Sequence, residues 1–470
     1  MTPPEDEVEL SPEDAERLGT LLAGALGASH AASTTVTIPP HKYWRFPGGQ
    51  EVDVPDSTVV TPGPITKEET LWETGEQARA WVFSARDDKK LTAPVIASDG
   101  FFHFGSSLKE WSVLWSDASA PYADGYPWAK DLQAAGKDLI ILGYKNRMAS
   151  ITDVNAKLAK ECILKTIAKR DGDTPLVVGG FSMGGLITRY TLALMENEQE
   201  DPEIKGPDHE TSTYFSYDSP HRGGWVPVSI QAFAHFLKVQ GIGALSNMLN
   251  SDASRQMAAY HISTHTDNPV PGPHAERTKF LADLAAVGSF PKGSADRPIK
   301  KIGVANGLAN GATRELPADN VTLTVNIQSL RIEATLYGQK PDPNHVVAKV
   351  KRLNETIVKT NGIPALDGAP GGTLATNQIA ADLINETFAD AASTKFPWVC
   401  FVPSVSAVDF ADPETSATVR IPYKPPAACG LDAYKCATAP APPSDDPKPH
   451  PHKHTLLTKE LCTWLLANFE

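Results

Sequence analysis

One hexapeptide constrains the fold of this chain more than any other feature. Gly180-Phe181-Ser182-Met183-Gly184-Gly185 follows the apolar run Pro175–Gly179 and opens the helix-like run Leu186–Leu194. A Gly-x-Ser-x-Gly pattern between a strand and a helix is typical of a nucleophile elbow, a sharp turn that lifts a serine hydroxyl above the edge of a sheet. Glycines flank such a serine because the strained turn and the close strand–helix packing leave no room for a Cβ.

The surroundings of Ser182 suggest where a negatively charged oxygen would be stabilised. The helix after the turn would direct its N-terminus and the Met183 N–H toward an oxyanion beside Ser182. A second donor is expected from the loop after the third strand of such a sheet. Asp99-Gly100-Phe101-Phe102 occupies that position. We therefore predict the Phe101 N–H as the second donor and Phe102 as part of an apolar wall for substrate.

The order of elements predicts an α/β fold with a mostly parallel sheet flanked by helices. Strand-like runs alternate with stretches of helical spacing, which indicates right-handed crossovers. The candidate strands are Ala80–Ser84, Pro94–Ser98, Asp138–Tyr144, Pro175–Gly179, Thr213–Tyr217, Ile302–Asn306 and Val399–Val402. We expect an N-terminal arm over residues 1–79, acidic and proline-rich with one possible strand at Thr34–Ile38, and the α/β domain over residues 80–470.

Two insertions are expected within that domain. The segment of about 225–290 is helical in pattern and unusually apolar, and it begins directly after Asp218–Gly224. This position predicts a lid over Ser182, with Trp225 among the residues that contact substrate. The segment of about 312–398 contains Val321–Ile327 and Leu330–Tyr337, which alternate with period two. These two runs predict a small antiparallel hairpin.

A serine nucleophile needs a base, and we predict that this base is His454. The base should lie just before the last helix. His454 precedes the helix-like run Lys459–Phe469, and Thr458 is a plausible N-cap. His450 and His452 share the same loop and are the alternatives. The His-Pro-His-Lys-His run could also be a small metal-binding tract. Because nothing else has ligand spacing, the sequence predicts no metal site.

The carboxylate that orients the base is expected between the serine and the histidine in chain order. Asp409 lies between the late strand Val399–Val402 and His454 and is the first choice. Asp218 is the alternative, because it ends the strand after the elbow and some hydrolases place their acid there.

Composition narrows the class of protein. The 470 residues include 41% apolar residues and carry a net charge of −13, which argues against a nucleic-acid partner. No run is long enough to span a bilayer. Residues 1–19 are acidic and lack the basic start of a secretory signal. We therefore expect a soluble protein, either cytoplasmic or secreted with its leader absent. Cys429 and Cys436 could form a local disulfide or stay as thiols.

These motifs carry a resemblance to a known family. Gly179–Gly185 reads Gly-Gly-Phe-Ser-Met-Gly-Gly and Asp218–Gly223 reads Asp-Ser-Pro-His-Arg-Gly, while the Asp99–Phe101 loop, Pro403–Asp409 and His454-Thr455 match more weakly. The chain resembles serine lipases and esterases of the α/β-hydrolase superfamily, in particular a bacterial branch with this elbow and turn. The resemblance implies hydrolysis of small-molecule or lipid esters, no cofactor and a helical cap. The chain departs from the Asp-Gly-x-Val-Pro pattern of lipid acyltransferases and lipases, since Val399-Cys400-Phe401 precedes Val402-Pro403.

The expected function is hydrolysis of carboxylic esters through an acyl-enzyme. Ser182 would attack the carbonyl and His454 would take and return the proton. The alternatives are an acyltransferase or thioesterase on the same residues, or a peptidase. A non-catalytic scaffold is disfavoured because the elbow, the oxyanion loop and the late histidine coincide.

Overall fold

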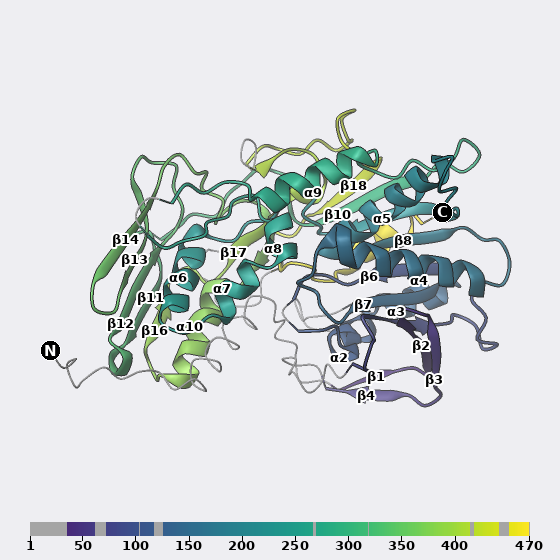
Figure 1. Cartoon of the computed structure of the whole chain (residues 1–470), viewed down its shortest axis with the longest axis horizontal. Coiled ribbons are helices and arrows are strands. Elements are labelled where there is room, and N and C mark those ends of the chain that lie inside the picture. The colour runs from purple at the N-terminus through teal and green to yellow at the C-terminus, as the bar shows by residue number, and fades with distance from the viewer. Residues whose placement is uncertain are drawn as a thin grey trace.

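Two lobes, each built on its own β-sheet, make up the structure (Figure 1). This computed structural model describes residues 35–61, 72–102, 104–116, 126–266, 269–317, 319–413, 418–440 and 451–469. We call the lobe with the nine-stranded sheet the main lobe and the lobe with the five-stranded sheet the second lobe. Within the described ranges, no helix is long and apolar enough to cross a membrane.

The nine-stranded sheet of the main lobe has the α/β-hydrolase fold, as the sequence predicts. In spatial order its strands are β3 (Gln50–Val54), β2 (His41–Phe46), β5 (Ala78–Phe83), β7 (Asp138–Tyr144), β6 (Pro94–Ser98), β8 (Leu176–Phe181), β9 (Thr211–Tyr217), β10 (Lys300–Leu308) and β18 (Ala433–Ala437). The strands from β7 to β18 run parallel, and β5, β2 and β3 continue the sheet antiparallel. β6 lies between β7 and β8. The chain therefore moves toward the β3 edge of the sheet from β6 to β7, and toward the β18 edge from β7 to β8, the strand that leads into Ser182.

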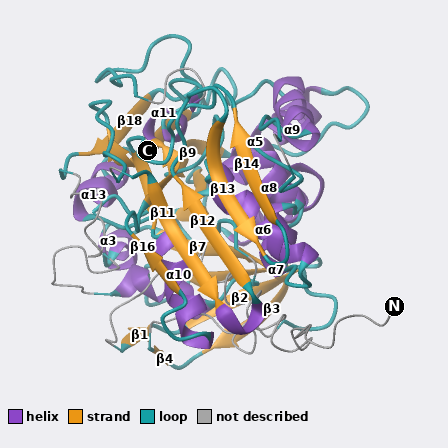
Figure 2. Ribbon diagram, turned by 90° about the vertical axis from the view of Figure 1, so that its left-hand side faces the viewer, coloured by secondary structure: helices purple, strands orange, loops and turns teal. Residues whose placement is uncertain are grey.

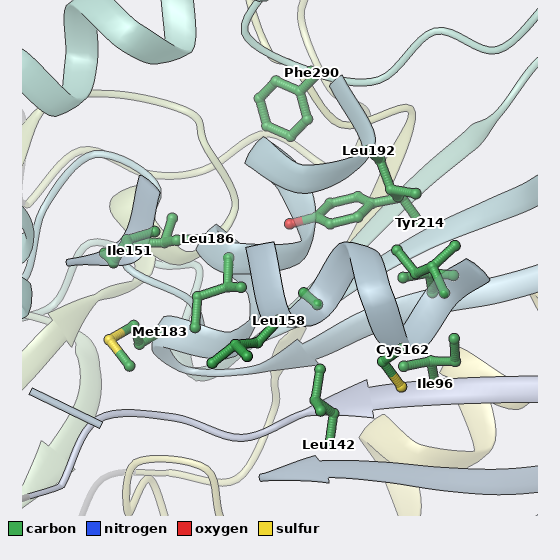
Figure 3. Close-up of a cluster of buried hydrophobic side chains, with 14 of the residues drawn as sticks. Ile96, Leu142, Ile151, Leu158, Cys162, Met183, Leu186, Leu192, Tyr214 and Phe290 are labelled. Atoms are coloured by element: carbon green, nitrogen blue, oxygen red, sulfur yellow. The ribbon is translucent and has the colours of Figure 1, made fainter. Parts of the chain in front are cut away.

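Both faces of this sheet are covered, so its central strands are apolar throughout. Side chains alternate between the faces along each strand. Leu139 and Ile141 of β7 pack toward the face that holds α3 (Trp128–Ala134) and α13 (Lys459–Leu466). Ile140 and Leu142, which alternate with them along β7, pack toward the opposite face, which holds α4 (Ala156–Lys169) and α5 (Met183–Glu200). Figure 3 shows part of this second core, with Ile96, Leu142, Leu158, Cys162 and Leu186 among its labelled side chains.

The N-terminal segment is more than the predicted arm. β1 (Val36–Ile38) lies within the predicted strand and pairs with β4 (Thr58–Val60). β2 pairs with β5, and β3 closes the edge, so the main sheet begins well before residue 80. The predicted boundary at residue 80 is therefore wrong. The mixed polar and aromatic pattern of these edge strands hides them from a search for apolar runs.

The second lobe is built from both predicted insertions (Figure 2). Its antiparallel sheet has the order β14 (Glu355–Thr360), β13 (His345–Lys351), β12 (Ile332–Tyr337), β11 (Val321–Ile327) and β16 (Ala392–Thr394). The predicted hairpin is present as β11 and β12, with Val325 opposite Ala334. It belongs to a larger sheet than expected, because charged residues on the solvent face of β13 and β14 mask their alternation.

The apolar residues of the 225–290 segment mostly cover this second sheet. The segment forms α6 (Val228–Val239), α7 (Ala244–Leu249), α8 (Asp252–Met257) and α9 (Ala275–Ala286). Phe233 and Phe236 of α6 share one core with Leu336 and Val350 of the sheet. A sheet with one apolar face needs such a cover, which accounts for most of the apolar pattern. A lid over Ser182 stays a prediction.

Two short strands join the lobes. β15 (Gly371–Leu374) and β17 (Val399–Pro403) form a separate antiparallel pair, after which α11 (Ser404–Ala407) packs on β10. β17 is the predicted late strand, but it lies outside the main sheet. The strand that completes the main sheet is β18, which is not among the candidate strands predicted from the sequence. Cys436 of β18 and Cys429 are both free thiols, so the local disulfide is absent.

Candidate active site

Ser182 occupies a strained turn between β8 and α5. Its backbone has φ 52° and ψ −123°, a conformation that non-glycine residues rarely adopt. The Ser182 N–H donates to the Tyr217 carbonyl at 2.9 Å, which ties the turn to β9. A Cβ on Gly184 would overlap the Ser98 carbonyl, so the glycines of the motif allow α5 to start directly against β6.

Ser182, His454 and Asp218 form one continuous chain of hydrogen bonds. The His454 Nε2 lies 2.8 Å from the Ser182 Oγ, and the His454 Nδ1 lies 2.7 Å from the Asp218 Oδ2. The Asp218 side chain is 0% exposed and the His454 side chain 8% exposed. A proton on Nδ1 held by Asp218 leaves Nε2 to accept the serine hydroxyl proton. This arrangement can turn the hydroxyl into a nucleophile.

Backbone and amide groups of the neighbouring strands fix Asp218 and the histidine loop together. The Asp218 N–H donates to the Val304 carbonyl at 2.8 Å, and the Asp218 Oδ1 accepts from the Asn306 N–H at 3.0 Å. The Asn306 side-chain amide and the Tyr217 hydroxyl both donate to the Leu456 carbonyl, at 2.8 and 2.7 Å. Asn306 therefore links the acid to the loop of His454. Sequence reasoning missed it, although it stands where the candidate strand Ile302–Asn306 ends.

The short strand β15 supports the same pair from the second insertion. The His454 N–H donates to the Thr373 carbonyl at 2.8 Å, and the Thr373 N–H donates to the His452 carbonyl at 2.8 Å. Gly372 packs directly on the Asp218 carboxylate, where a Cβ would overlap the Oδ2. β15 thus holds the histidine loop and encloses the acid.

The choice of Asp409 as the acid is wrong, and the alternative Asp218 contacts His454 instead. Asp409 follows α11, and its Oδ1 accepts from the Arg222 Nε at 3.0 Å. Its Oδ2 accepts from the Gly430 N–H at 2.8 Å. The chain-order argument failed because β17, which precedes Asp409, pairs with β15 and does not lead to the elbow.

The other histidines of the late loop have different surroundings. The His452 Nε2 lies 2.7 Å from the Ala439 carbonyl, and the side chain is buried there. His450 lies outside the described residues. No three His, Cys, Asp or Glu side chains gather as a possible metal site in the described part of the chain.

Both predicted oxyanion donors belong to segments that border Ser182. Met183 is the first residue of α5, and the first N–H groups of a helix have no acceptor within it. The loop after β6 lies against the elbow, since a Cβ on Gly100 would lie 3.1 Å from the Ser182 Cβ. Phe101 directly follows this point of contact. The elbow and this loop can therefore direct backbone N–H groups toward one oxygen.

A small apolar pocket adjoins these residues. Its cavity of about 50 Å³ lies between the lobes and is lined mainly by apolar side chains, among them Phe101, Phe102, Trp225, Met248, Met257 and Phe401. The Phe401 ring packs edge-on against the His454 ring, with centroids 4.9 Å apart. The Trp225 Nε1 donates to the buried Asp367 Oδ1 at 2.7 Å, which fixes the indole in the wall. Phe102 and Trp225, the predicted substrate contacts, both line this pocket.

Comparisons with known proteins give structural likeness at low identity. No protein-family model and no curated protein matches the chain. The chain is similar to an esterase from the hyperthermophilic archaeon Pyrobaculum calidifontis, at 13% identity and a TM-score of 0.28, over 63% of this chain and 74% of that one. It is also similar to the thermostable carboxylesterase EstE1 from a metagenomic library, at 14% identity and a TM-score of 0.25, over 59% and 84%. A third similar structure is the Bacillus licheniformis lipase BlEst2 with its propeptide, at 12% identity and a TM-score of 0.28, over 48% of this chain and 38% of that one.

Replacing Asp218 or Asp409 by asparagine should distinguish the roles of these two aspartates. Asp218→Asn should slow labelling of Ser182 by a fluorophosphonate probe about 10³-fold or more, because an amide no longer holds the reactive imidazole tautomer. Asp409→Asn should leave labelling unchanged and lower the melting temperature, because Arg222 loses its buried partner. Labelling rates at equal folded fraction measure the difference. Equal labelling of Asp218→Asn and the unmodified chain would contradict the assignment.

Gly372→Ala, a change in β15, should also slow labelling of Ser182 by the fluorophosphonate probe. The added methyl group must displace the Asp218 carboxylate, and a shift of about 1 Å in a reacting group can cost about 10²-fold in rate. The matched control is Gly272→Ala, because a Cβ at Gly272 meets no atom within 4 Å. Probe-labelling rates test this expectation, and equal rates for the two alanine variants would refute it.

Proposed function

We propose that this protein is a serine hydrolase that cleaves carboxylic esters through an acyl-enzyme. The observation that carries the proposal is the hydrogen-bonded series from Ser182 through His454 to the buried Asp218, on the strained elbow of an α/β-hydrolase fold. Each group has the partner that its role requires: the hydroxyl meets the base, and the base meets the carboxylate.

The acylation step uses these groups in order. The Ser182 Oγ attacks the ester carbonyl carbon while the His454 Nε2 takes the hydroxyl proton. Asp218 stabilises the imidazolium that forms. The Met183 and Phe101 N–H groups would donate to the oxyanion of the tetrahedral intermediate. The C–O bond to the alcohol then breaks, and His454 returns the proton to the departing alkoxide, so the alcohol leaves and Ser182 carries the acyl group.

Deacylation repeats the sequence with water as the nucleophile. His454 takes a proton from water, the hydroxide attacks the acyl carbonyl, and the second tetrahedral intermediate uses the same donors. Its collapse releases the carboxylic acid, and the Ser182 Oγ recovers the proton from His454. No cofactor enters either step.

The pocket between the lobes supports an ester with a compact apolar group. Its wall includes Phe101, which follows the Gly100 that lies against Ser182, and Phe401, whose ring packs against His454. The apolar lining favours alkyl or aryl groups, because burial of apolar surface is worth about 25 cal/mol per Å². The small cavity favours short groups over long ones.

Ser182→Ala tests the proposal. We expect the variant to fold and to lose ester hydrolysis about 10³-fold or more, since only the nucleophilic hydroxyl is removed. Rates on p-nitrophenyl esters of two to sixteen carbons give the measurement, with an acyl-CoA and a peptide anilide as parallel arms. Ester turnover that survives in the variant, or faster cleavage of the anilide or the acyl-CoA, would overturn the proposed function.

Met257→Ala should move the chain-length optimum toward longer esters. Met257 lies in α8 and closes part of the pocket, so its truncation enlarges the space. The matched control is Met195→Ala, in which a buried methionine of α5 is truncated within the main core. Both variants should lose about 2–5 kcal/mol of stability. A shift of the optimum in both variants, or in neither, would contradict the role of Met257.

A further inference from the structure

A single buried arginine fastens the loop that borders Ser182. Arg147 follows β7, and its side chain is 1% exposed. Its Nε donates to the Phe104 carbonyl at 2.9 Å, and its guanidinium donates to the Asp99 Oδ2 at 2.9 Å and to the Glu110 Oε1 at 3.0 Å. We call the segment 99–107 the oxyanion loop. Asp99 lies at its start, Phe104 in its middle and Glu110 just after its end.

Asp99, which binds Arg147, also accepts hydrogen bonds from the backbone next to Ser182 and from within the loop. Its Oδ1 accepts from the Gly100 N–H at 2.6 Å, and its Oδ2 also accepts from the Ser106 hydroxyl. The Tyr144 N–H donates to the same hydroxyl oxygen at 2.8 Å, which ties the loop to β7. Gly100 lies against Ser182, so the Asp99 carboxylate holds the Asp99–Gly100 peptide, one residue before the Phe101 N–H.

Arg147 also contacts the wall of the apolar pocket. The centre of its guanidinium lies 4.9 Å from the centroid of the Phe102 ring, within the range of a cation–π interaction. Phe102 lines the pocket together with Phe101. One side chain therefore contacts Asp99 and Phe102, the residues on either side of Gly100-Phe101, and Phe102 belongs to the surface that would receive an apolar group.

Two carboxylates contact Arg147, and Asp99 is the more deeply buried of them. Burial raises the pKa of Glu110, and the nearby Asp99 charge adds to this effect while Arg147 opposes it. Removing Arg147 would leave a buried Asp99 carboxylate without a counter-charge, which is strongly destabilising for the local structure.

We propose that Arg147 is a positioning residue, which holds the oxyanion loop so that the Phe101 N–H meets the developing oxyanion and the Phe102 ring closes the pocket. The proposal rests on the proposed ester hydrolysis. If Arg147 positions both groups, its replacement should change the catalytic rate and the preference for chain length together. A general loss of stability would not change both.

The test compares Arg147→Met and Arg147→Lys with the matched control Arg170→Met. Arg170 is also nearly buried and donates to two carbonyls and to Glu210, but it precedes β8 at the end of the strand far from Ser182. Three measurements on the full chain, at equal folded fraction, decide the outcome: kcat and KM on the p-nitrophenyl ester series, the inhibition constant of an alkyl trifluoromethyl ketone, and the chain-length optimum.

Arg147→Met should lower kcat about 10²-fold with little change in KM, since a misplaced oxyanion donor costs that much. The trifluoromethyl ketone, whose hemiketal oxygen mimics the oxyanion, should bind correspondingly more weakly, and the chain-length preference should broaden. Arg147→Lys should recover part of kcat, because an ammonium reaches one carboxylate but cannot make the forked contacts. Kinetic constants of Arg147→Met that equal those of Arg170→Met, or a loss confined to KM, would overturn the proposal.

Amide hydrogen exchange keeps this test separate from the proposed function. Exchange in the oxyanion loop should accelerate in Arg147→Met and stay unchanged in Arg170→Met. If the unmodified chain hydrolyses no ester, the proposed function fails while the exchange result still decides whether Arg147 holds the loop. If esters are hydrolysed and exchange in the loop is unchanged in Arg147→Met, the positioning role fails and the proposed function stands.

Discussion

The buried charge of Asp218 is the constraint on which the rest of the site depends. A carboxylate that is 0% exposed must be balanced within the protein, and here the partners are an imidazole and a backbone N–H instead of a guanidinium. An arginine in that place would compete with the imidazolium of the proposed reaction. Asp409 differs from Asp218 in this respect, because Arg222 already supplies its counter-charge. Of these two carboxylates, it is Asp218 that contacts His454.

This arrangement explains why the second lobe matters for the site. The insertion of about 312–398 builds the five-stranded sheet and also contains β15. Gly372 of β15 packs on the Asp218 carboxylate, and the Thr373 carbonyl accepts a hydrogen bond from the His454 N–H. The other insertion contributes Trp225 to the pocket, while most of its apolar side chains cover the second sheet. The two lobes therefore meet at the proposed triad and the apolar pocket, and this contact gives an acidic chain an apolar pocket without a large exposed patch.

Sequence reasoning succeeded where one local pattern dictates the structure. Strands buried on both faces are continuous apolar runs, so β7 is recovered to the residue, and the glycines around Ser182 reveal the elbow because backbone contacts exclude a Cβ. The acid could not be placed in this way, because an aspartate after a strand looks the same whether that strand joins the main sheet or a separate pair. β18 was missed for a related reason: Ala433–Ala437 is short and mixed in character, and only its pairing with β10 makes it a strand. Asn306 carries no sequence signal beyond its place at the end of a strand.

Asp409 does not contact His454 but is joined to the turn that carries Asp218. Arg222 of the turn Asp218–Gly223 donates to the Asp409 Oδ1 at 3.0 Å. The His221 Nδ1 accepts from the Arg189 guanidinium at 3.2 Å, so the Nε2 of the neutral ring donates to the Ser216 hydroxyl at 2.9 Å. Burial, with the charges of Arg189 and Arg222, holds the pKa of His221 well below its ordinary value, so this imidazole stays neutral and serves as a fixed link from β9 to α5. The Asp-Ser-Pro-His-Arg-Gly motif thus combines Asp218, the proposed acid, with a buried histidine that joins β9 to α5 and an arginine that contacts Asp409.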